Sequence, residues 1–158
     1  MKTKLLLIGA VAALFFYGWI TRPVDEALYL PENFEGCAAV VYNIRGIPDL
    51  EIEKHTINYY FDEDGILLTN SPLDFGWEGR KTSGFSKTEY YYVHTNGDVS
   101  EIPIENIGPS TLGEYSVDGR VRLTSYTTSI GTMENACEDY VEKLDKLVDK
   151  KLKNMWKD

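Results

Sequence analysis

Short runs of β-branched and aromatic residues, each bounded by turn-forming residues, constrain the fold of this chain more than any other feature. Asp-Gly or Asn-Gly steps separate several of these runs. Such steps favour tight turns because glycine readily adopts the positive backbone φ angles that two-residue hairpins need. The spacing predicts three β-hairpins, formed by 55–61 with 66–69, by 88–94 with 99–102, and by 114–117 with 120–126.

A further strand is predicted at 37–43, ahead of these hairpins. Its residues from Ala38 to Tyr42 are apolar on both faces, which is typical of a strand covered on both sides. The runs together give about seven strands, enough for a small sandwich or a curled barrel. We expect a mainly β fold, a small antiparallel β-sandwich, with one β domain over residues 31–131 and a linker over 23–30.

The end of the chain has a different pattern. From Met133 to Trp156 there is no glycine or proline, and apolar residues recur at helical spacing among charged ones. An amphipathic α-helix is therefore predicted within residues 132–158. Its apolar stripe is expected to pack on the β domain; pairing with another helix and lying on a membrane are the alternatives. The stripe consists of Cys137, Val141, Leu144, Val148, Leu152 and Met155.

The start of the chain resembles a secretion signal. Lys2 and Lys4 precede an uncharged, mostly apolar run over 5–20, so residues 1–22 are predicted to be a signal peptide or a signal anchor. No small-residue cleavage site follows the run, which favours an uncleaved membrane helix. Cleavage with secretion is one alternative, and a lipid anchor is the third option, although Cys37 lies well beyond the apolar run. The lysines favour a cytoplasmic amino end. The β domain is expected outside the cytoplasm, anchored to the membrane or secreted.

Charge and cysteine content narrow the functional classes. The formal net charge of the 158 residues is −9, and an acidic surface repels phosphate backbones, so nucleic acid is not expected as a partner. The two cysteines, Cys37 and Cys137, suit a disulfide in an oxidising compartment. Two separate buried thiols are the other interpretation.

Candidate catalytic groups are few. The two histidines, His55 and His94, have no second histidine or cysteine at metal-ligand spacing. The acidic turn at 62–65 lacks the remaining ligands of a calcium-binding loop. No nucleophile or nucleotide motif is present. We expect no catalytic residue, no metal site and no cofactor, and therefore not an enzyme.

A binding role has some support from aromatic residues. Trp77 and Arg80 lie in a glycine-containing loop between 70 and 87, and Tyr91 is the middle residue of a tyrosine triplet. Alternate strand residues face opposite sides of a sheet, so each aromatic triplet places at least one ring outward. We predict Trp77, Arg80 and Tyr91 as ligand contacts. The alternatives are that the loop aromatics pin the loop to the core and that the tyrosines form ordinary cross-strand pairs.

Several short segments together resemble a bacterial family known as domain of unknown function 6843. The segments are Leu30 to Gly36, Val40 to Asn43, Gly65 to Leu67, Ser71-Pro72, Gly76-Trp77, Tyr90 to Val93 and Ile130 to Thr132. The resemblance spans roughly residues 30 to 140. It implies a secreted or membrane-anchored envelope protein and supplies no activity.

We therefore expect an extracytoplasmic binding or scaffolding module that contacts an unknown envelope ligand or protein partner. The alternative is an interaction subunit of a membrane complex that uses its anchor or its terminal helix. An enzyme of unknown class is the third possibility.

Overall fold

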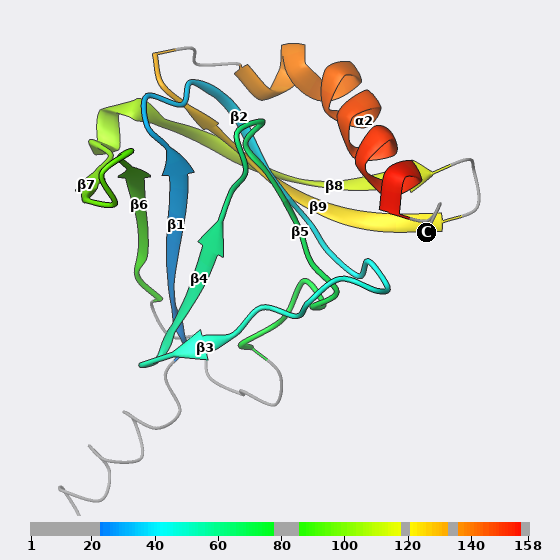
Figure 1. Cartoon of the computed structure of the whole chain (residues 1–158), viewed down its shortest axis with the longest axis horizontal. Helices are drawn as coiled ribbons and strands as arrows, with labels where there is room; N and C mark the ends of the chain where they lie inside the picture. The colour runs from blue at the N-terminus through cyan, green and yellow to red at the C-terminus, as the bar shows by residue number, and fades with distance from the viewer. Residues whose placement is uncertain (1–22, 78–85, 118–120, 133–135, 156–158) are drawn as a thin grey trace, which may run out of the picture.

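Two β-sheets and one long helix make up the computed structural model of the chain, which describes residues 23–77, 86–117, 121–132 and 136–155. The first sheet has five strands in the order β3-β4-β1-β6-β7 and the second has four in the order β5-β2-β9-β8. In the first, the strands are β3 (Ile52–Glu53), β4 (Thr56–Tyr60), β1 (Asp25–Pro31), β6 (Thr88–Val93) and β7 (Val99–Glu101). In the second, they are β5 (Ile66–Leu68), β2 (Gly36–Val41), β9 (Val121–Ile130) and β8 (Ile107–Val117). A short 3₁₀ turn, Ile104–Asn106, connects β7 to β8. Figure 1 shows the two sheets and α2 (Ala136–Met155) lying over the four-stranded one.

The strand pairing is mixed, so the predicted purely antiparallel sandwich is wrong. β1 runs parallel to both β4 and β6, and β2 runs parallel to β5. Parallel neighbours cannot be joined by a tight turn, because the chain must cross over to start the next strand at the same edge. The number of strands among the described residues, nine, also exceeds the predicted value of about seven.

β1 corrects the prediction of a linker over 23–30. Its inward side chains Leu28 and Leu30 are 3% and 0% exposed, and it is the central strand of its sheet. The period-two pattern that marks a half-buried strand is present, with Val24, Leu28 and Leu30 on one face, but Glu26 interrupts it. Its parallel partners lie about 30 and 60 residues further along the chain, so no local turn signal identifies it.

The three predicted hairpins have different outcomes. β6 with β7 and β8 with β9 are antiparallel pairs, which confirms two of them. The turn 118–120 of the second pair lies outside the described residues. β4 and β5 belong to different sheets, so the first predicted hairpin is wrong. The turn at 62–65 does form, with the Gly65 N–H donating to the Asp62 carbonyl at 2.9 Å, but it carries the chain from one sheet to the other.

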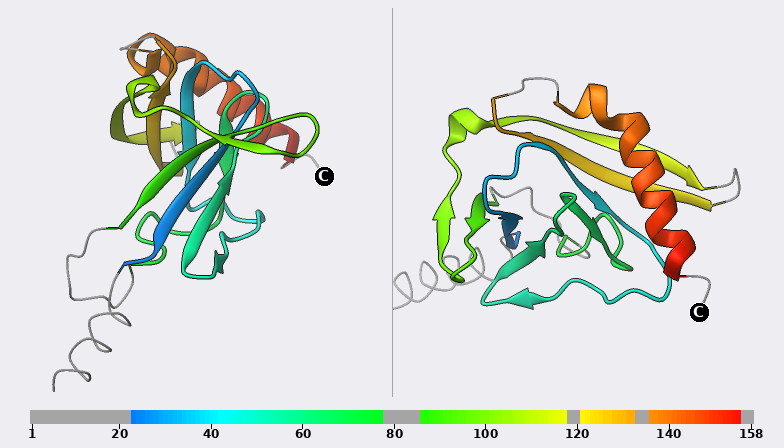
Figure 2. Two further views of the ribbon diagram at one scale, coloured as in Figure 1. Left: turned by 90° about the vertical axis from the view of Figure 1, so that its left-hand side faces the viewer. Right: turned by 45° about the horizontal axis from the view of Figure 1, so that its top comes forward.

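β2 separates two hydrophobic cores, as its apolar residues on both faces predict. Ala38 and Val40 point into a core between the two sheets, which we call the inter-sheet core. Ala39 and Val41 point to the opposite side, where they pack against Leu144, Val148 and Leu152 of α2 in the helix–sheet core. Figure 2 shows α2 running across the four-stranded sheet. The order of layers is therefore five-stranded sheet, four-stranded sheet, helix.

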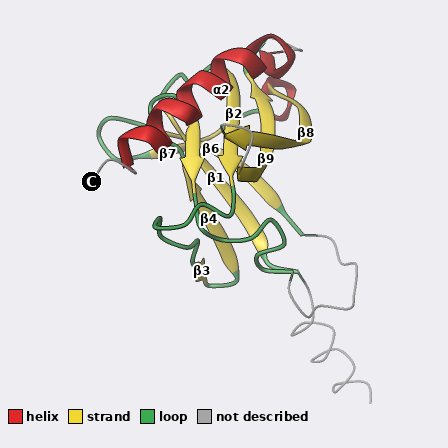
Figure 3. Ribbon diagram, turned by 90° about the vertical axis from the view of Figure 1, so that its right-hand side faces the viewer, coloured by secondary structure: helices red, strands yellow, loops and turns green. Residues whose placement is uncertain are grey.

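α2 confirms the predicted terminal helix and its packing on the β domain, as Figure 3 shows from the side. A disulfide joins Cys137 at its start to Cys37 of β2, with the Cα atoms 4.8 Å apart. Near its other end, the Lys151 ammonium contacts the carboxylates of Asp62 and Asp64 at 2.6 and 2.9 Å. The helix is thus fixed to the β domain at both ends.

The predicted leader, residues 1–22, lies outside the described residues. Within the ranges that the structure describes, no helix is long and apolar enough to cross a membrane.

Candidate functional site

Three tyrosines form a continuous row on the outer face of the five-stranded sheet. Tyr60, Tyr29 and Tyr91 lie directly opposite one another in the register of β4, β1 and β6. The ring centroids of Tyr29 and Tyr60 are 4.7 Å apart with an interplanar angle of 13°, and those of Tyr29 and Tyr91 are 5.4 Å apart at 18°. We call this set the tyrosine row. It forms because residues at the same register on adjacent strands place their side chains on the same face.

The stacking determines which parts of the rings a ligand can reach. Both faces of the Tyr29 ring are covered, one by Tyr60 and the other by Tyr91. Sugar rings bind aromatic residues mainly by stacking on open ring faces, and here only the outer faces of the two end rings are available. Tyr60 is the most accessible, at 61% exposure. The row offers solvent hydroxyls, which suit hydrogen bonding, and the outer faces of its two end rings, which can attract a cation.

Carboxylates border the tyrosine row. Burial raises the pKa of Tyr29, and the negative charges of Glu89 and Glu53 raise it further, together with neighbouring Tyr60. Burial also raises the pKa of Tyr91, as do a hydrogen bond to Glu89 and the charges of Glu89 and Glu101. Strand register gives the same placement, since Glu101 lies opposite Tyr91 and Glu89 lies two residues before Tyr91 on the same face of β6.

One lysine accompanies these carboxylates on the same face. Lys87 pairs with Glu89 at 2.6 Å, and this hydrogen bond lowers the pKa of the Glu89 carboxyl. Among the residues that the structure describes, these three carboxylates and one ammonium leave this part of the surface with a net negative charge.

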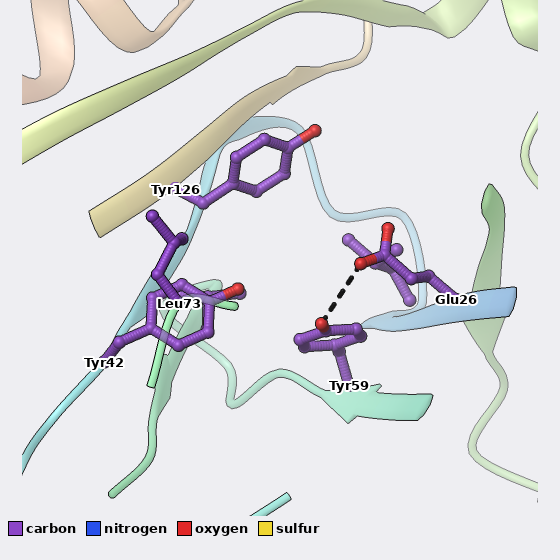
Figure 4. A pocket seen from close by; sticks show the side chains of 7 residues that line it. Glu26, Tyr42, Tyr59, Leu73 and Tyr126 are labelled. Atoms are coloured by element: carbon purple, nitrogen blue, oxygen red, sulfur yellow. Dashed lines mark hydrogen bonds between the residues drawn. The ribbon is translucent and has the colours of Figure 1, made fainter. Parts of the chain in front are cut away.

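A cavity of about 130 Å³ lies on the other side of the same sheet, between the two sheets. Figure 4 shows its polar end, where the Tyr59 hydroxyl donates to the Glu26 carboxylate at 3.3 Å. The other carboxylate oxygen of Glu26 accepts from the Thr88 hydroxyl at 3.2 Å. The lining residues are Glu26, Leu28, Val40, Tyr42, Tyr59, Leu73 and Tyr126.

The phenols of the inter-sheet core are strongly held in their neutral form. Burial raises the pKa of Tyr59 far above its ordinary value, and the charge of Glu26 adds to the shift. Burial likewise raises the pKa of Tyr42, despite a hydrogen-bonding interaction with Tyr59. Burial raises the pKa of Tyr90 to about 12, with a further contribution from Tyr126. The inter-sheet core therefore contains a network of neutral phenols around one carboxylate.

Of the predicted ligand contacts Trp77, Arg80 and Tyr91, the described residues include Trp77 and Tyr91, which belong to different elements. Tyr91 belongs to the tyrosine row. Trp77 is 37% exposed and lies at the end of a turn, where its backbone N–H donates to the Asp74 carbonyl at 2.8 Å. Arg80 lies outside the described residues. Phe75 packs against the inter-sheet core, so one loop aromatic does pin the loop, as the alternative interpretation held.

The histidines are separate from each other and from the tyrosine row. The ring of His55 contacts the Pro23 carbonyl at 2.9 Å, and the ring of His94 contacts Glu32 and Ser100, each at 2.9 Å. Within the described residues, no group of three or more His, Cys, Asp or Glu is arranged to hold a metal ion. Both cysteines are in the disulfide, so the chain has no free thiol.

Sequence reasoning missed Tyr29, Tyr60 and Glu26. Tyr60 is the middle residue of a second aromatic triplet, Tyr59-Tyr60-Phe61, and identifying its outward member requires the register of β4. Tyr29 and Glu26 both lie in the segment interpreted as a linker. The alternation of Val24, Leu28 and Leu30 was the available signal for that strand.

The sequence matches the model of a protein family described as a family of unknown function (DUF6843) over residues 24–141. The chain belongs to this family. The match confirms the resemblance seen in the sequence. The segment that matches DUF6843 includes β1 and both cysteines of the disulfide. No curated protein is similar to the chain in sequence.

The fold of this DUF6843 member is shared with a solved structure. That crystal structure is of a protein described as a "Putative Lipoprotein" from Bacillus anthracis, with a TM-score of 0.62 and 19% sequence identity. The similarity covers 83% of this chain and 95% of the other. At this identity it shows that the two proteins have the same overall fold.

Proposed function

We propose that this protein is a non-catalytic binding module on the outer side of a bacterial membrane, and that its tyrosine row holds a positively charged segment of another protein. The observation that carries the proposal is the stacked row of Tyr60, Tyr29 and Tyr91 bordered by carboxylates. A role of Trp77 and Arg80 in ligand contact remains a prediction that needs its own test.

A cationic segment fits the outer face better than a sugar or an anion. Lysine and arginine side chains pair with carboxylates, and their charged groups are attracted to aromatic rings. Phenol oxygens and the outer ring faces of Tyr60 and Tyr91 remain accessible to a cation, and the carboxylate of Glu101 lies opposite Tyr91 in the register of β6 and β7. The net charge of −9 would also increase the rate of encounter with a basic partner.

Three observations support a location outside the cytoplasm. The first twenty residues have the basic and apolar pattern of a secretion signal. Disulfides persist mainly in oxidising compartments, and Cys37 is joined to Cys137. The solved structure with the same fold is described as a "Putative Lipoprotein".

The non-catalytic part of the proposal is supported by how the reactive groups are used. Both cysteines are in the disulfide, and His55 and His94 are held at different places by different partners. His94 does contact the hydroxyl of Ser100 and the carboxylate of Glu32, an order of groups that hydrolytic triads use, but here these contacts lie on exposed surface at the β6–β7 hairpin.

Location is tested by expressing the tagged full-length chain in a bacterial host, followed by membrane fractionation, intact-mass measurement and protease treatment of whole cells. We expect a full-length mass in the membrane fraction and cleavage of the domain by external protease. A shortened mass in the medium would mean a secreted form of the same module. Protection from external protease in intact cells would contradict the proposed location.

Binding is tested with an oligolysine peptide and the full-length protein. Replacing Tyr60 and Tyr91 together with serine is expected to weaken binding at least about tenfold, as loss of aromatic contact residues does in other interfaces. Ile104→Ser, at a residue 79% exposed outside the row, is the control and should bind like the wild type.

Two outcomes would overturn the proposed ligand class. Equal binding of oligolysine by the double tyrosine variant would mean that surface charge alone attracts the peptide. Saturable binding of N-acetylglucosamine oligomers, with no binding of oligolysine, would assign the tyrosine row to a sugar ligand instead.

A further inference from the structure

The inter-sheet cavity contains a negative charge without a positive partner. Glu26 is half-buried, and its two carboxylate oxygens accept hydrogen bonds from the hydroxyls of Tyr59 and Thr88. Among the residues that the structure describes, no lysine, arginine or histidine forms an ion pair with it. A carboxylate removed from water is usually paired with a cation, because hydroxyl donors alone compensate only part of the lost hydration.

The walls of the cavity are suited to an organic cation. Three tyrosines, Tyr42, Tyr59 and Tyr126, supply aromatic surface and phenol oxygens. Leu28, Val40 and Leu73 supply apolar surface. Aromatic rings beside a carboxylate are the arrangement that recognises ammonium groups bearing alkyl substituents, since the rings attract the charge and the apolar surface covers the alkyl groups.

Size and access limit the ligand. A volume of about 130 Å³ accommodates a small molecule of a few carbon atoms and excludes large ones. Leu73, one of the lining residues, is 39% exposed, so the cavity reaches the protein surface beside this side chain. Tyr42 and Tyr59 are 4% and 5% exposed and form the deep end.

Charge selects a cation over a neutral molecule or an anion. The high pKa values of the Tyr42 and Tyr59 phenols keep both groups neutral in the physiological range. The charge lining the cavity is therefore that of the Glu26 carboxylate, which would repel an anion. A neutral molecule would leave this charge uncompensated.

We propose that the cavity between the two sheets, lined by Glu26, Tyr42, Tyr59 and Tyr126, is a binding site for a small alkylammonium ion. The ammonium group lies against Glu26 and the phenol oxygens, and the alkyl groups contact Leu28, Val40 and Leu73. This site is on the opposite face of the five-stranded sheet from the tyrosine row and is independent of the cationic protein segment proposed for that row.

The probe is tetramethylammonium, with tert-butanol as the neutral molecule of similar shape and tetrapropylammonium as an oversized cation. Binding is followed by NMR of the full-length protein with labelled tyrosine rings. We expect saturable shifts at Tyr42, Tyr59 and Tyr126 with tetramethylammonium, and at Tyr29, Tyr60 and Tyr91 only weak shifts that do not saturate over the same range. The neutral and the oversized probes should produce no saturable shift.

Glu26→Gln removes the charge with little change in shape. We expect it to weaken tetramethylammonium binding by about tenfold or more, as loss of a charged partner does. Glu105→Gln removes a carboxylate from the exposed 3₁₀ turn, outside both the cavity and the tyrosine row, and should bind like the wild type. If Glu26→Gln fails to fold, Leu73→Trp provides the second test: this residue is 39% exposed, and a larger side chain should obstruct the cavity and abolish binding.

The proposal is overturned by any of three results. The first is an absence of saturable binding, as for a cavity that holds only water. The second is equal binding of tert-butanol and tetramethylammonium, which would show that the charge of Glu26 does not matter. The third is unchanged binding in a folded Glu26→Gln or Leu73→Trp variant.

Discussion

The two cores on either side of β2 have different chemistry. The inter-sheet core combines aliphatic residues with buried tyrosines and the half-buried Glu26, and it contains a cavity. The helix–sheet core consists of aliphatic side chains from β2, the loop that follows it, β5, β9 and α2. A disulfide and an ion-pair cluster hold α2 at its two ends.

The difference shows how each layer is stabilised. Backbone hydrogen bonds within each sheet keep the facing surfaces of the inter-sheet core in place, so that polar groups and a cavity can be accommodated there. α2 has no backbone pairing with the sheet beneath it, and its described core residues are three aliphatic side chains. Covalent and ionic contacts supplement this limited contact area. We therefore expect cross-links to matter most on the helix side and phenol chemistry to matter most between the sheets.

The largest expected loss of stability comes from breaking the disulfide that holds α2 to β2. Replacing Cys37 and Cys137 together with alanine removes a link between residues 100 positions apart. The free energy of unfolding should fall by about 2–4 kcal/mol, with about 4.7 kcal/mol as the chain-entropy limit for a closure of this length. Urea unfolding of variant and wild type measures the change, and limited proteolysis should cut α2 first in the variant.

Reduction of the wild type is the matched control for this prediction. A thiol reductant should destabilise the wild type and leave the double alanine variant unchanged. A variant as stable as the oxidised wild type would show that the helix–sheet core holds α2 without the bond.

A smaller effect is expected from the phenol network between the sheets. Tyr59→Phe leaves one oxygen of the half-buried Glu26 carboxylate without its hydroxyl donor, which should cost about 1–3 kcal/mol near neutral pH. Urea unfolding near pH 7 measures this cost. Tyr60→Phe, at an exposed position, is the control and should change stability little.

Because of the same buried phenols, we expect the free energy of unfolding to fall at alkaline pH. The pKa values of Tyr42, Tyr59 and Tyr90 are raised in the folded state from the ordinary value of 10. A raised pKa favours the folded state below pH 10, and this advantage is lost as the pH rises, because the unfolded phenols ionise first. Each phenol should reduce the free energy of unfolding by about 1.4 kcal/mol per pH unit above 10 until its folded pKa is reached. Unfolding curves from pH 8 to 12 should be flatter for Tyr59→Phe than for the wild type, and a flat wild-type curve would contradict the prediction.

The smallest effect is expected for the ionic contact between α2 and the turn at 62–65. Lys151→Met removes the ion pairs with Asp62 and Asp64, which are partly exposed, so the cost should stay below about 1 kcal/mol. Partial burial lowers the pKa of Lys151, but the two hydrogen bonds outweigh it and the net shift is upward.

The salt dependence separates this contact from ordinary helix pairs. The effect of Lys151→Met should largely disappear at about 1 M salt, where the screening length falls to about 3 Å. Lys146→Met removes a pair within α2, with Glu142, and should cost no more than about 0.5 kcal/mol. Equal losses for the two variants would mean that the contact with the turn adds nothing beyond an ordinary helix pair.

Local signals predicted the elements that form from neighbouring residues. The Asn96-Gly97 turn between β6 and β7, the β8–β9 hairpin and the terminal helix are all present. The apolar faces of β2 also predicted a covered strand, and family resemblance was visible in the short motifs. Of the predicted contact residues, only Tyr91 was placed in the tyrosine row.

The remaining features depend on contacts between distant residues. Asp62 to Gly65 form the predicted turn, but whether the next strand pairs back with β4 or moves to another sheet depends on β2. Tyr29 belongs to the tyrosine row only because β1 lies between β4 and β6. The sequence allowed Cys37 and Cys137 to be bridged or separate, and the packing of α2 on β2 brings them together.

By itself, the amino-acid sequence determined the period-two and helical patterns, the turn sites, the acidic charge and the secretion-like start, because each depends on residues near one another in the chain. Only the tertiary structure decided the parallel pairing of β1, the tyrosine row, the cavity at Glu26 and the disulfide. These arise from strand order and register, which are set by burial over the whole domain and leave no mark in any single segment.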